Sequence, residues 1–383
     1  MFKIGVRTEE SRLTSWYFEI DRRLLLCVLL LMLLSLVFSV SAGSVAAERI
    51  HQPWFFFFLK ALPFYGLGLV ALFIASFCSK KWVMRLAGVD LALGLLLLPV
   101  TVFAPHLING SARFVSLFGF NIMPADIMKP GFVIMTAYFL SKMKEKYGKD
   151  IFFNKDAWRF DSWLSWVYYL SVFFVVLCII FDHPDFGTTV LYLAVFAIML
   201  FVAGLSWFFL PVFGTIGLTA LTIAFFTLPH VHRRFITFFT GQGDDYQVRF
   251  SVETLQNGGL LGARNDAFVK QKLPDAHTDF IYAVIVEDLG ALVGCALLFT
   301  LFYVLRRLIV NATKAKDLFV LYSIGGTAAL FGIQICINMM TTLGLMPPKG
   351  MTLPFISYGG SSLIAYCVLF GFVLALIRED KWK

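Results

Sequence analysis

Polar clusters in this otherwise apolar chain have the residue types needed for catalysis. The clearest is the segment Leu273–Phe280, which places Asp275, His277 and Asp279 directly before an apolar run. A carboxylate at the mouth of a helix bundle can take a proton from a substrate hydroxyl if a partly desolvated site raises its pKa toward the working pH. We therefore predict Asp279 as a general base. Two alternatives stay open: Asp279 could cap the following helix, or His277 could be the base, although a lone loop histidine is more often solvated.

Charged residues also surround a short apolar run that starts near residue 127. Arg113 precedes the run, and the segment Met123–Lys129 supplies Asp126 and Lys129. Acids and lysines in a membrane span usually line a cavity rather than face lipid. We predict that Arg113, Asp126 and Lys129 bind substrate. The alternative is a helix that starts at Pro124, with an acid in its first turn and a snorkelling Lys129.

A third polar stretch, residues 347–362, is rich in proline, glycine and serine and lies between two apolar runs. Proline and glycine interrupt helices. Non-helical backbone at membrane depth is tolerated only where neighbouring protein or a water-filled cavity supplies hydrogen bonds to its N–H and C=O groups. This predicts a site here, with Lys349 and Ser357 as substrate-binding candidates. Gln247 and Ser251 are weaker candidates from the preceding loop. Asp185 could belong to the site or cap the helix that follows it.

Membrane-spanning helices must position these groups. The 383 residues are 59% hydrophobic and 15% charged, with a mean hydropathy of +0.80, which excludes an ordinary soluble domain. Apolar runs long enough to cross about 30 Å of hydrocarbon predict an all-α polytopic protein of about ten helices. Its single membrane domain covers 24–377, between tails 1–23 and 378–383. The predicted spans are residues 24–42, 54–78, 86–105, 127–140, 163–181, 187–204, 207–228, 280–305, 318–343 and 353–377.

The lysines and arginines predict the orientation of these spans. Cations gather in both tails and in the connections at 80–85, 142–149 and 306–316, which predicts that these segments and both termini are cytoplasmic. The segment 229–279, between spans seven and eight, must then be a long external loop; its cations do not oppose this, because long loops translocate largely regardless of charge. The net charge of +8 is thus a topology signal. A cleaved signal peptide is disfavoured, because the first apolar run is longer than usual and its polar lead is long.

No cofactor is predicted from the chain. Its six cysteines lie in or beside apolar runs without paired spacing, which indicates neither a disulfide framework nor a zinc site. No ligand spacing indicates a divalent cation, and a cation requirement stays open.

The motifs resemble the SEDS family (shape, elongation, division and sporulation) of bacterial cell-wall polymerases over nearly the whole chain. The family's Leu-Pro-Glu-Ala-His-Thr-Asp-Phe is similar to Leu273–Phe280, with Asp275 in place of Glu. Its Pro-Thr-Lys-Gly-Leu-Thr-Leu-Pro, followed by Ile-Ser-Tyr-Gly-Gly-Ser-Ser, is similar to Pro347–Ser362. Gln334 and Asn338 also match residues of the family pattern. A lysine at position 349 is similar to the division branch of the family. The loops around Arg113 and Asp126 depart from the family pattern.

The resemblance implies a ten-helix glycosyltransferase that joins lipid II into glycan strands at the outer face of the bacterial cytoplasmic membrane during cell division. Asp279 would be its general base, and Arg113 and Lys129 would stabilise the charge that develops on the leaving pyrophosphate. The implied partners are a single-span class B penicillin-binding transpeptidase and other division proteins.

Two other functions remain open at this point. A flippase for the same lipid would use intramembrane acids such as Asp90, Glu287 and Asp288 along a passage. A scaffold that only recruits the transpeptidase would leave the external polar groups unexplained. A flippase needs access from both faces, whereas the polar clusters are predicted on one face, and this favours the polymerase.

Overall fold

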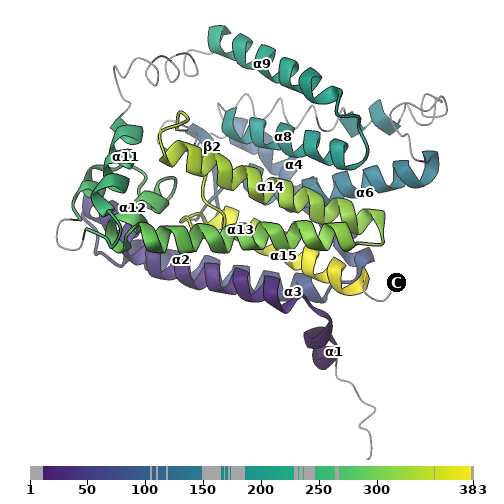
Figure 1. Ribbon diagram of the computed structural model, residues 1–383, viewed down its shortest axis with the longest axis horizontal. Coiled ribbons are helices and arrows are strands. Elements are labelled where there is room, and N and C mark those ends of the chain that lie inside the picture. The colour runs from purple at the N-terminus through teal and green to yellow at the C-terminus, as the bar shows by residue number, and fades with distance from the viewer. Residues whose placement is uncertain are drawn as a thin grey trace, which may run out of the picture.

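The computed structural model describes residues 12–103, 106–108, 111–117, 120–148, 165–167, 169–170, 173, 186–227, 232, 236, 246–263, 267–348 and 350–380. These residues form a bundle of long helices with smaller elements gathered at one end (Figure 1). Within these described ranges, six helices are long and apolar enough to cross a membrane, as expected for a helical multi-pass protein. They are α2 (Arg22–Arg49), α3 (Phe56–Phe77), α4 (Lys80–Phe103), α13 (Ala291–Lys314), α14 (Leu318–Thr342) and α15 (Gly360–Asp380).

The remaining elements are shorter or less apolar. The predicted run 127–140 corresponds to two helices that meet at Met128, and the predicted run 163–181 is described only in part. The further helices are α1 (Arg12–Glu19), α5 (Pro124–Ile127), α6 (Lys129–Tyr147), α8 (Phe186–Val202), α9 (Phe209–Thr227), α11 (Tyr246–Gly258), the 3-10 helix η3 (Val269–Lys272) and α12 (Ile281–Leu289).

Helix α15 lies at the centre of the bundle. Of its most apolar window 83% is buried, compared with 22% for α3, against which it packs. The two backbones approach closely because Gly371 faces α3: a Cβ at this position would lie 2.5 Å from the Cβ of Ala75. Small residues permit such close packing between membrane helices, where contact between backbones replaces the hydrophobic driving force.

The all-α prediction is wrong for residues 106–122. They form a three-stranded antiparallel sheet of β1 (His106–Ile108), β2 (Ser111–Leu117) and β3 (Phe120–Ile122) in the order β1-β2-β3. Val115 pairs with Ile122, and Leu117 pairs with Phe120. Polar and apolar residues alternate within each half of β2, residues 111–114 and 115–117, which is the period of a strand, but the apolar helix before β2 dominates any hydropathy average.

The predicted span 280–305 is also wrong, because the chain reverses at Gly290. This residue has φ 90°, a conformation that favours glycine, and it separates α12 from α13. The two helices pack side by side: a Cβ on Gly294 would lie 2.7 Å from the side chain of Val286 and 2.9 Å from the hydroxyl of Tyr282. Residues on both sides of the break are apolar, so hydropathy alone reads them as one span.

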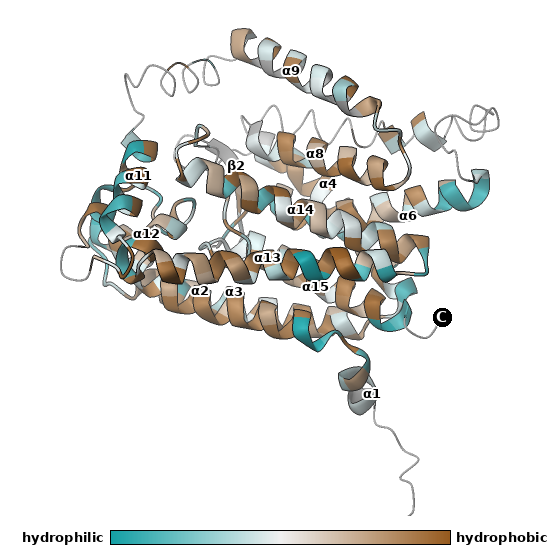
Figure 2. Ribbon diagram, viewed as in Figure 1, coloured by the Kyte–Doolittle hydropathy of each residue, from teal (hydrophilic) through white to brown (hydrophobic). Residues whose placement is uncertain are grey.

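Polar residues gather mainly at the two ends of the bundle (Figure 2). We call one of them the loop end; it is formed by the β-strands, α11, η3, α12 and residues 350–359 (Figure 1). At the opposite end Asp21 caps α2 and accepts hydrogen bonds from Arg307 at 2.9 and 3.0 Å and from Asn311 at 2.7 Å. These bonds tie the start of α2 to α13.

Candidate active site

Asp279 lies on a compact turn that leads into α12. The carbonyl of Asp275 accepts hydrogen bonds from the backbone N–H groups of Thr278 and Asp279, both at 3.1 Å. Asp275 itself has φ 50°, a left-handed conformation that aspartate tolerates better than most residues. The N-cap of α12 is Phe280, so Asp279 precedes the capping position that the alternative role required.

A single amide joins the two segments that the sequence singled out. Asn338, on α14, donates through Nδ2 to the carbonyl of Asp279 at 2.8 Å and to the carbonyl of Met351 at 2.7 Å. The backbone N–H of Tyr358 also donates to the carbonyl of His277 at 2.9 Å. The turn that carries Asp279 is therefore attached to the glycine- and serine-rich segment.

The expectation that His277 is solvated is wrong. Its ring contacts those of Phe57 and Tyr358, at centroid distances of 4.6 and 5.3 Å. Burial, together with the positive charge of Arg49, lowers the pKa of His277 to about 4. Its buried Nδ1 has no hydrogen-bond partner in the described part of the chain. The imidazole is thus neutral at neutral pH and forms part of the wall beside Asp279.

Lys129 does not snorkel to the surface. Its side chain is 4% exposed, and Nζ lies 2.7 Å from Oδ1 of Asp126. The same ammonium donates to Oε1 of Gln334 at 3.0 Å, and Tyr366 donates to that oxygen at 2.7 Å. Ser361 donates to the second oxygen of Asp126 at 3.3 Å. The buried charge is therefore paired and surrounded by hydrogen bonds, as burial of a charge requires.

Helix α14 connects this ion pair to the turn of Asp279. Gln334 donates through Nε2 to the carbonyl of Thr352 at 2.8 Å, and Asn338 lies one helical turn farther along the same helix. Both amides thus hold the segment 350–358 against the bundle. Asp90, on α4, accepts from the backbone N–H of Gly131 at 2.8 Å and fixes the start of α6.

The other predicted substrate-binding residues differ in their surroundings. Ser251 is fully buried and donates to the carbonyl of Thr342 at 2.8 Å, which joins α11 to α14. Ser357 accepts from the N–H of Leu353 at 2.7 Å and closes a turn. Gln247 is half-buried on α11. Arg113 belongs to β2, but its side chain lies outside the described residues, as do Lys349 and Asp185.

Glu287 is one of the acids that the flippase alternative would place along a passage, and the structure places it in the loop end. Its carboxylate is fully buried and accepts from Nδ2 of Asn257 at 2.6 Å and from the N–H groups of Val269 at 3.0 Å and Lys270 at 2.8 Å. These bonds hold α11 and η3 on α12. The break at Gly290 is the sequence signal that could have separated this acid from a membrane span.

Asp288 completes the attachment of the loop end to α2. It forms an ion pair with Lys270 and accepts a hydrogen bond from Ser41. Lys270 also donates to the hydroxyl of Ser41 at 3.1 Å. The two acids at the end of α12 therefore bind neighbouring elements, which is a structural role that a flippase passage does not require.

Replacement of Glu287 by alanine is expected to destabilise the protein by about 2–4 kcal/mol, because it leaves buried donors of Asn257, Val269 and Lys270 without an acceptor. Thermal unfolding in detergent measures the loss, and limited proteolysis of the segment 259–272 shows whether the loop end opens. Glu253→Ala, on the half-buried face of α11, is the matched control. Equal unfolding midpoints for the two variants would contradict this role for Glu287.

The arrangement combines a carboxylate at the loop end with a buried, paired cation and a wall of amide and hydroxyl groups. Among the residues that the structure describes, no group of three or more His, Cys, Asp or Glu side chains could hold a metal ion. The side chains of this site suit proton transfer and the binding of a polar substrate that arrives at the end of a membrane bundle.

Known proteins are similar over almost the whole chain. A family model described as a cell cycle protein, FtsW/RodA/SpoVE, matches residues 21–382. The "Probable peptidoglycan glycosyltransferase FtsW" of Caulobacter vibrioides is 30% identical over 97% of this chain and 93% of its own length. The protein of the same name from Coxiella burnetii is 31% identical over 96% of this chain and 98% of its own length. The "Stage V sporulation protein E" of Bacillus subtilis is 30% identical over 94% of this chain and 98% of its own length.

Solved structures share the fold. A chain from a study of polymerization and crosslinking by a peptidoglycan synthase complex has a TM-score of 0.76 and 25% identity, and covers 95% of this chain and 99% of that one. The rod shape determining protein RodA of Thermus thermophilus has a TM-score of 0.66 and 26% identity, with 95% and 98% covered.

Proposed function

Because the chain belongs to the FtsW/RodA/SpoVE family of cell cycle proteins, we propose that it is a peptidoglycan glycosyltransferase that polymerises lipid II during cell division. The observation that carries the proposal is the bridge made by Asn338, which holds the turn of Asp279 and the segment after Met351 together. Both are segments on which the resemblance to cell-wall polymerases rests, and one side chain bonds to both.

Asp279 is the general base in this proposal. The acceptor sugar hydroxyl loses its proton to the Asp279 carboxylate as its oxygen attacks the anomeric carbon of the donor. The bond between that carbon and the pyrophosphate oxygen breaks, and the lipid-linked pyrophosphate leaves with the electron pair. The products are an extended glycan and a free lipid pyrophosphate, so atoms and charge balance.

Lys129 is proposed to stabilise the negative charge that develops on the leaving pyrophosphate. Its resting partner is Asp126, at 2.7 Å. A pyrophosphate carries more negative charge than a carboxylate and can compete with Asp126 for the ammonium. Arg113, Lys349 and Gln247 remain proposed substrate contacts. The bonds of Ser251 and Ser357 instead support a role in shaping the walls.

We also propose a ten-span topology for residues 24–377, with both termini cytoplasmic and the loop 229–279 at the outer face, where its reaction would occur. Cations at the opposite end of the bundle, such as Lys80 and Arg307, support this orientation by the positive-inside rule. The proposed partner is a class B penicillin-binding transpeptidase, which would act with other division proteins at the division site of the bacterial inner membrane.

A reconstitution assay tests the function. The full chain, with its transpeptidase, is supplied with purified lipid II in vesicles, with and without Mg²⁺, since no cofactor is proposed beyond a cation requirement that the assay decides. Glycan strands longer than the disaccharide support the polymerase. Movement of lipid II across the vesicle membrane without any polymer would replace this proposal with the flippase.

A further inference from the structure

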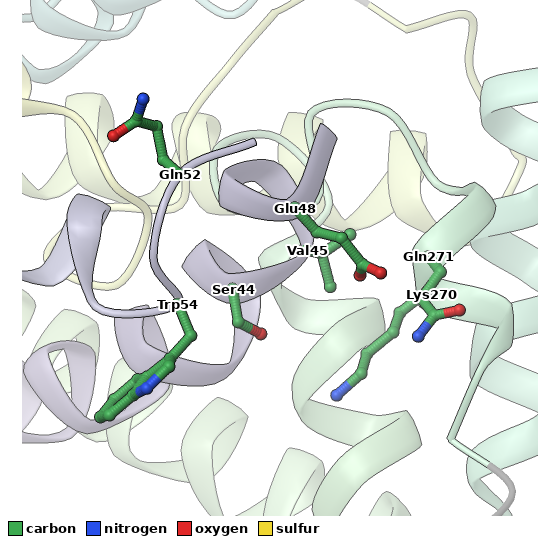
Figure 3. A pocket seen from close by; sticks show the side chains of 7 residues that line it. All are labelled: Ser44, Val45, Glu48, Gln52, Trp54, Lys270 and Gln271. Atoms are coloured by element: carbon green, nitrogen blue, oxygen red, sulfur yellow. The ribbon is translucent and has the colours of Figure 1, made fainter. Parts of the chain in front are cut away.

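A small pocket opens beside the candidate active site. It has a volume of about 300 Å³ and is lined by Ser44, Val45, Glu48, Gln52, Trp54, Lys270 and Gln271. Figure 3 shows that α2 supplies Ser44, Val45 and Glu48, that the chain after α2 supplies Gln52 and Trp54, and that Lys270 and Gln271 face them from η3. None of these residues belongs to the site described above.

The side chains of the pocket can bind a ligand that is neutral and rich in hydroxyl and amide groups. Within the described ranges, the carboxylate of Glu48 and the side-chain amides of Gln52 and Gln271 have no hydrogen-bond partner. Trp54 is 61% exposed and offers a broad ring face at the edge of the pocket. The ring packs against apolar C–H groups, while the carboxylate and amides accept and donate hydrogen bonds.

The charges at the pocket disfavour an anion as its main ligand. The ammonium of Lys270 is already compensated by its ion pair with Asp288 and its bond to Ser41. Glu48 adds a negative charge that has no partner in the described part of the chain. A phosphate or pyrophosphate would therefore meet a repelling carboxylate and a lysine that is already paired, while the guanidinium of Arg49, next to Glu48 in the chain, is bonded to the carbonyl of Gln271. A sugar ring, with one apolar face and polar edges, matches the groups that remain.

Two chain neighbours of the pocket residues connect the pocket to the surroundings of Asp279. Arg49, at the end of α2, donates to the carbonyl of Gln271 at 2.6 Å. Phe57 lies three residues after Trp54, and its ring contacts that of His277, on the turn that carries Asp279, at 4.6 Å between centroids. A sugar chain that leaves the site along this wall would reach the pocket without crossing the apolar bundle.

We propose that this pocket binds an N-acetylated sugar residue of the glycan, with Trp54 packed on the sugar ring and Glu48 and Gln271 bonded to its polar groups. The inference rests on the proposed function and extends it, because it adds a second saccharide contact beside the reacting centre. Two sources share this chemistry: the growing strand and the disaccharide of lipid II. The growing strand is the assigned occupant, since the pocket lies beside the site rather than in it.

The test uses the full chain in nanodiscs, because detergents with sugar headgroups could occupy the pocket. The probes are a neutral tetrasaccharide of N-acetylglucosamine, free of lipid, and lipid II itself. Binding is measured by calorimetry for wild type, Trp54→Ala and Glu48→Gln. Trp82→Ala is the matched control, because Trp82 is 54% exposed on α4 and lies outside the pocket.

Trp54→Ala is expected to weaken tetrasaccharide binding at least about tenfold and to shorten the strands made from lipid II, and Trp82→Ala is expected to change neither. If Trp54→Ala binds both probes as the wild type does, or if Trp82→Ala weakens binding equally, the inference is wrong. Trp54-dependent binding of lipid II alone would overturn the growing strand as occupant. If wild type binds the tetrasaccharide through Trp54 but makes no polymer, the proposed function fails while the pocket stands.

Discussion

Replacement of Asp279 by asparagine is expected to slow glycan polymerisation by about 10²–10⁴-fold, which is the usual contribution of a general base. Asparagine has nearly the size and shape of aspartate but cannot accept the proton of the attacking hydroxyl. The bond from Asn338 goes to the backbone carbonyl of residue 279, so the substitution leaves that attachment in place. The loss should therefore appear in the rate of bond formation and not in the fold.

The matched control for this variant is Asp275→Asn, four residues earlier on the same turn. Asp275 has φ 50°, and asparagine is among the few residues that tolerate this conformation. Initial rates of glycan formation and lipid II binding are measured for both variants in the reconstituted system. A base at position 279 requires that Asp279→Asn binds lipid II but does not polymerise it. Equal rates for the two variants would remove Asp279 from the chemistry.

The sequence alone predicted the class of fold and the segments of the site, because each depends on local composition. Within a bilayer, the backbone polar groups of a long apolar run can be hydrogen-bonded only in a helix or a closed barrel, and six helices in the described part of the chain are long and apolar enough to cross a membrane. The segments around Asp279 and Met351 stood out because polar and helix-breaking residues interrupt apolar runs. That Asn338 joins these two segments depends on tertiary contacts that no local pattern contains.

The errors share a physical cause. Hydropathy reports how apolar a residue is but not the direction of the chain, so the reversal at Gly290 was invisible between two apolar helices. The same limit left the role of Glu287 open, because an acid inside a supposed span suits a passage, whereas an acid at the end of α12 can accept bonds from three neighbouring donors. The burial of Lys129 agrees with its predicted interior place rather than with the snorkelling alternative, but its second partner, Gln334, lies far away in sequence and no local pattern contains it.

The ion pair of Asp126 and Lys129 allows a second large effect to be divided into structural and catalytic parts. Lys129→Met is expected to destabilise the protein by about 3–5 kcal/mol, because it leaves the Asp126 carboxylate buried without its cation. The matched control is Lys142→Met on the same helix. Lys142 forms an ion pair with Glu145 at the same three-residue spacing, but its side chain is 57% exposed, so its loss should cost less than about 1 kcal/mol.

The double variant Asp126→Asn/Lys129→Met separates the two parts. Without either charge, no carboxylate is left unpaired, and most of the lost stability should return in thermal unfolding. If Lys129 stabilises the charge on the leaving pyrophosphate, polymerisation should stay about 10²–10³-fold below wild type, because no cation replaces the ammonium. Recovery of polymerisation together with stability would instead mean that Lys129 acts only by neutralising Asp126, and the charge on the leaving group would then need another cation.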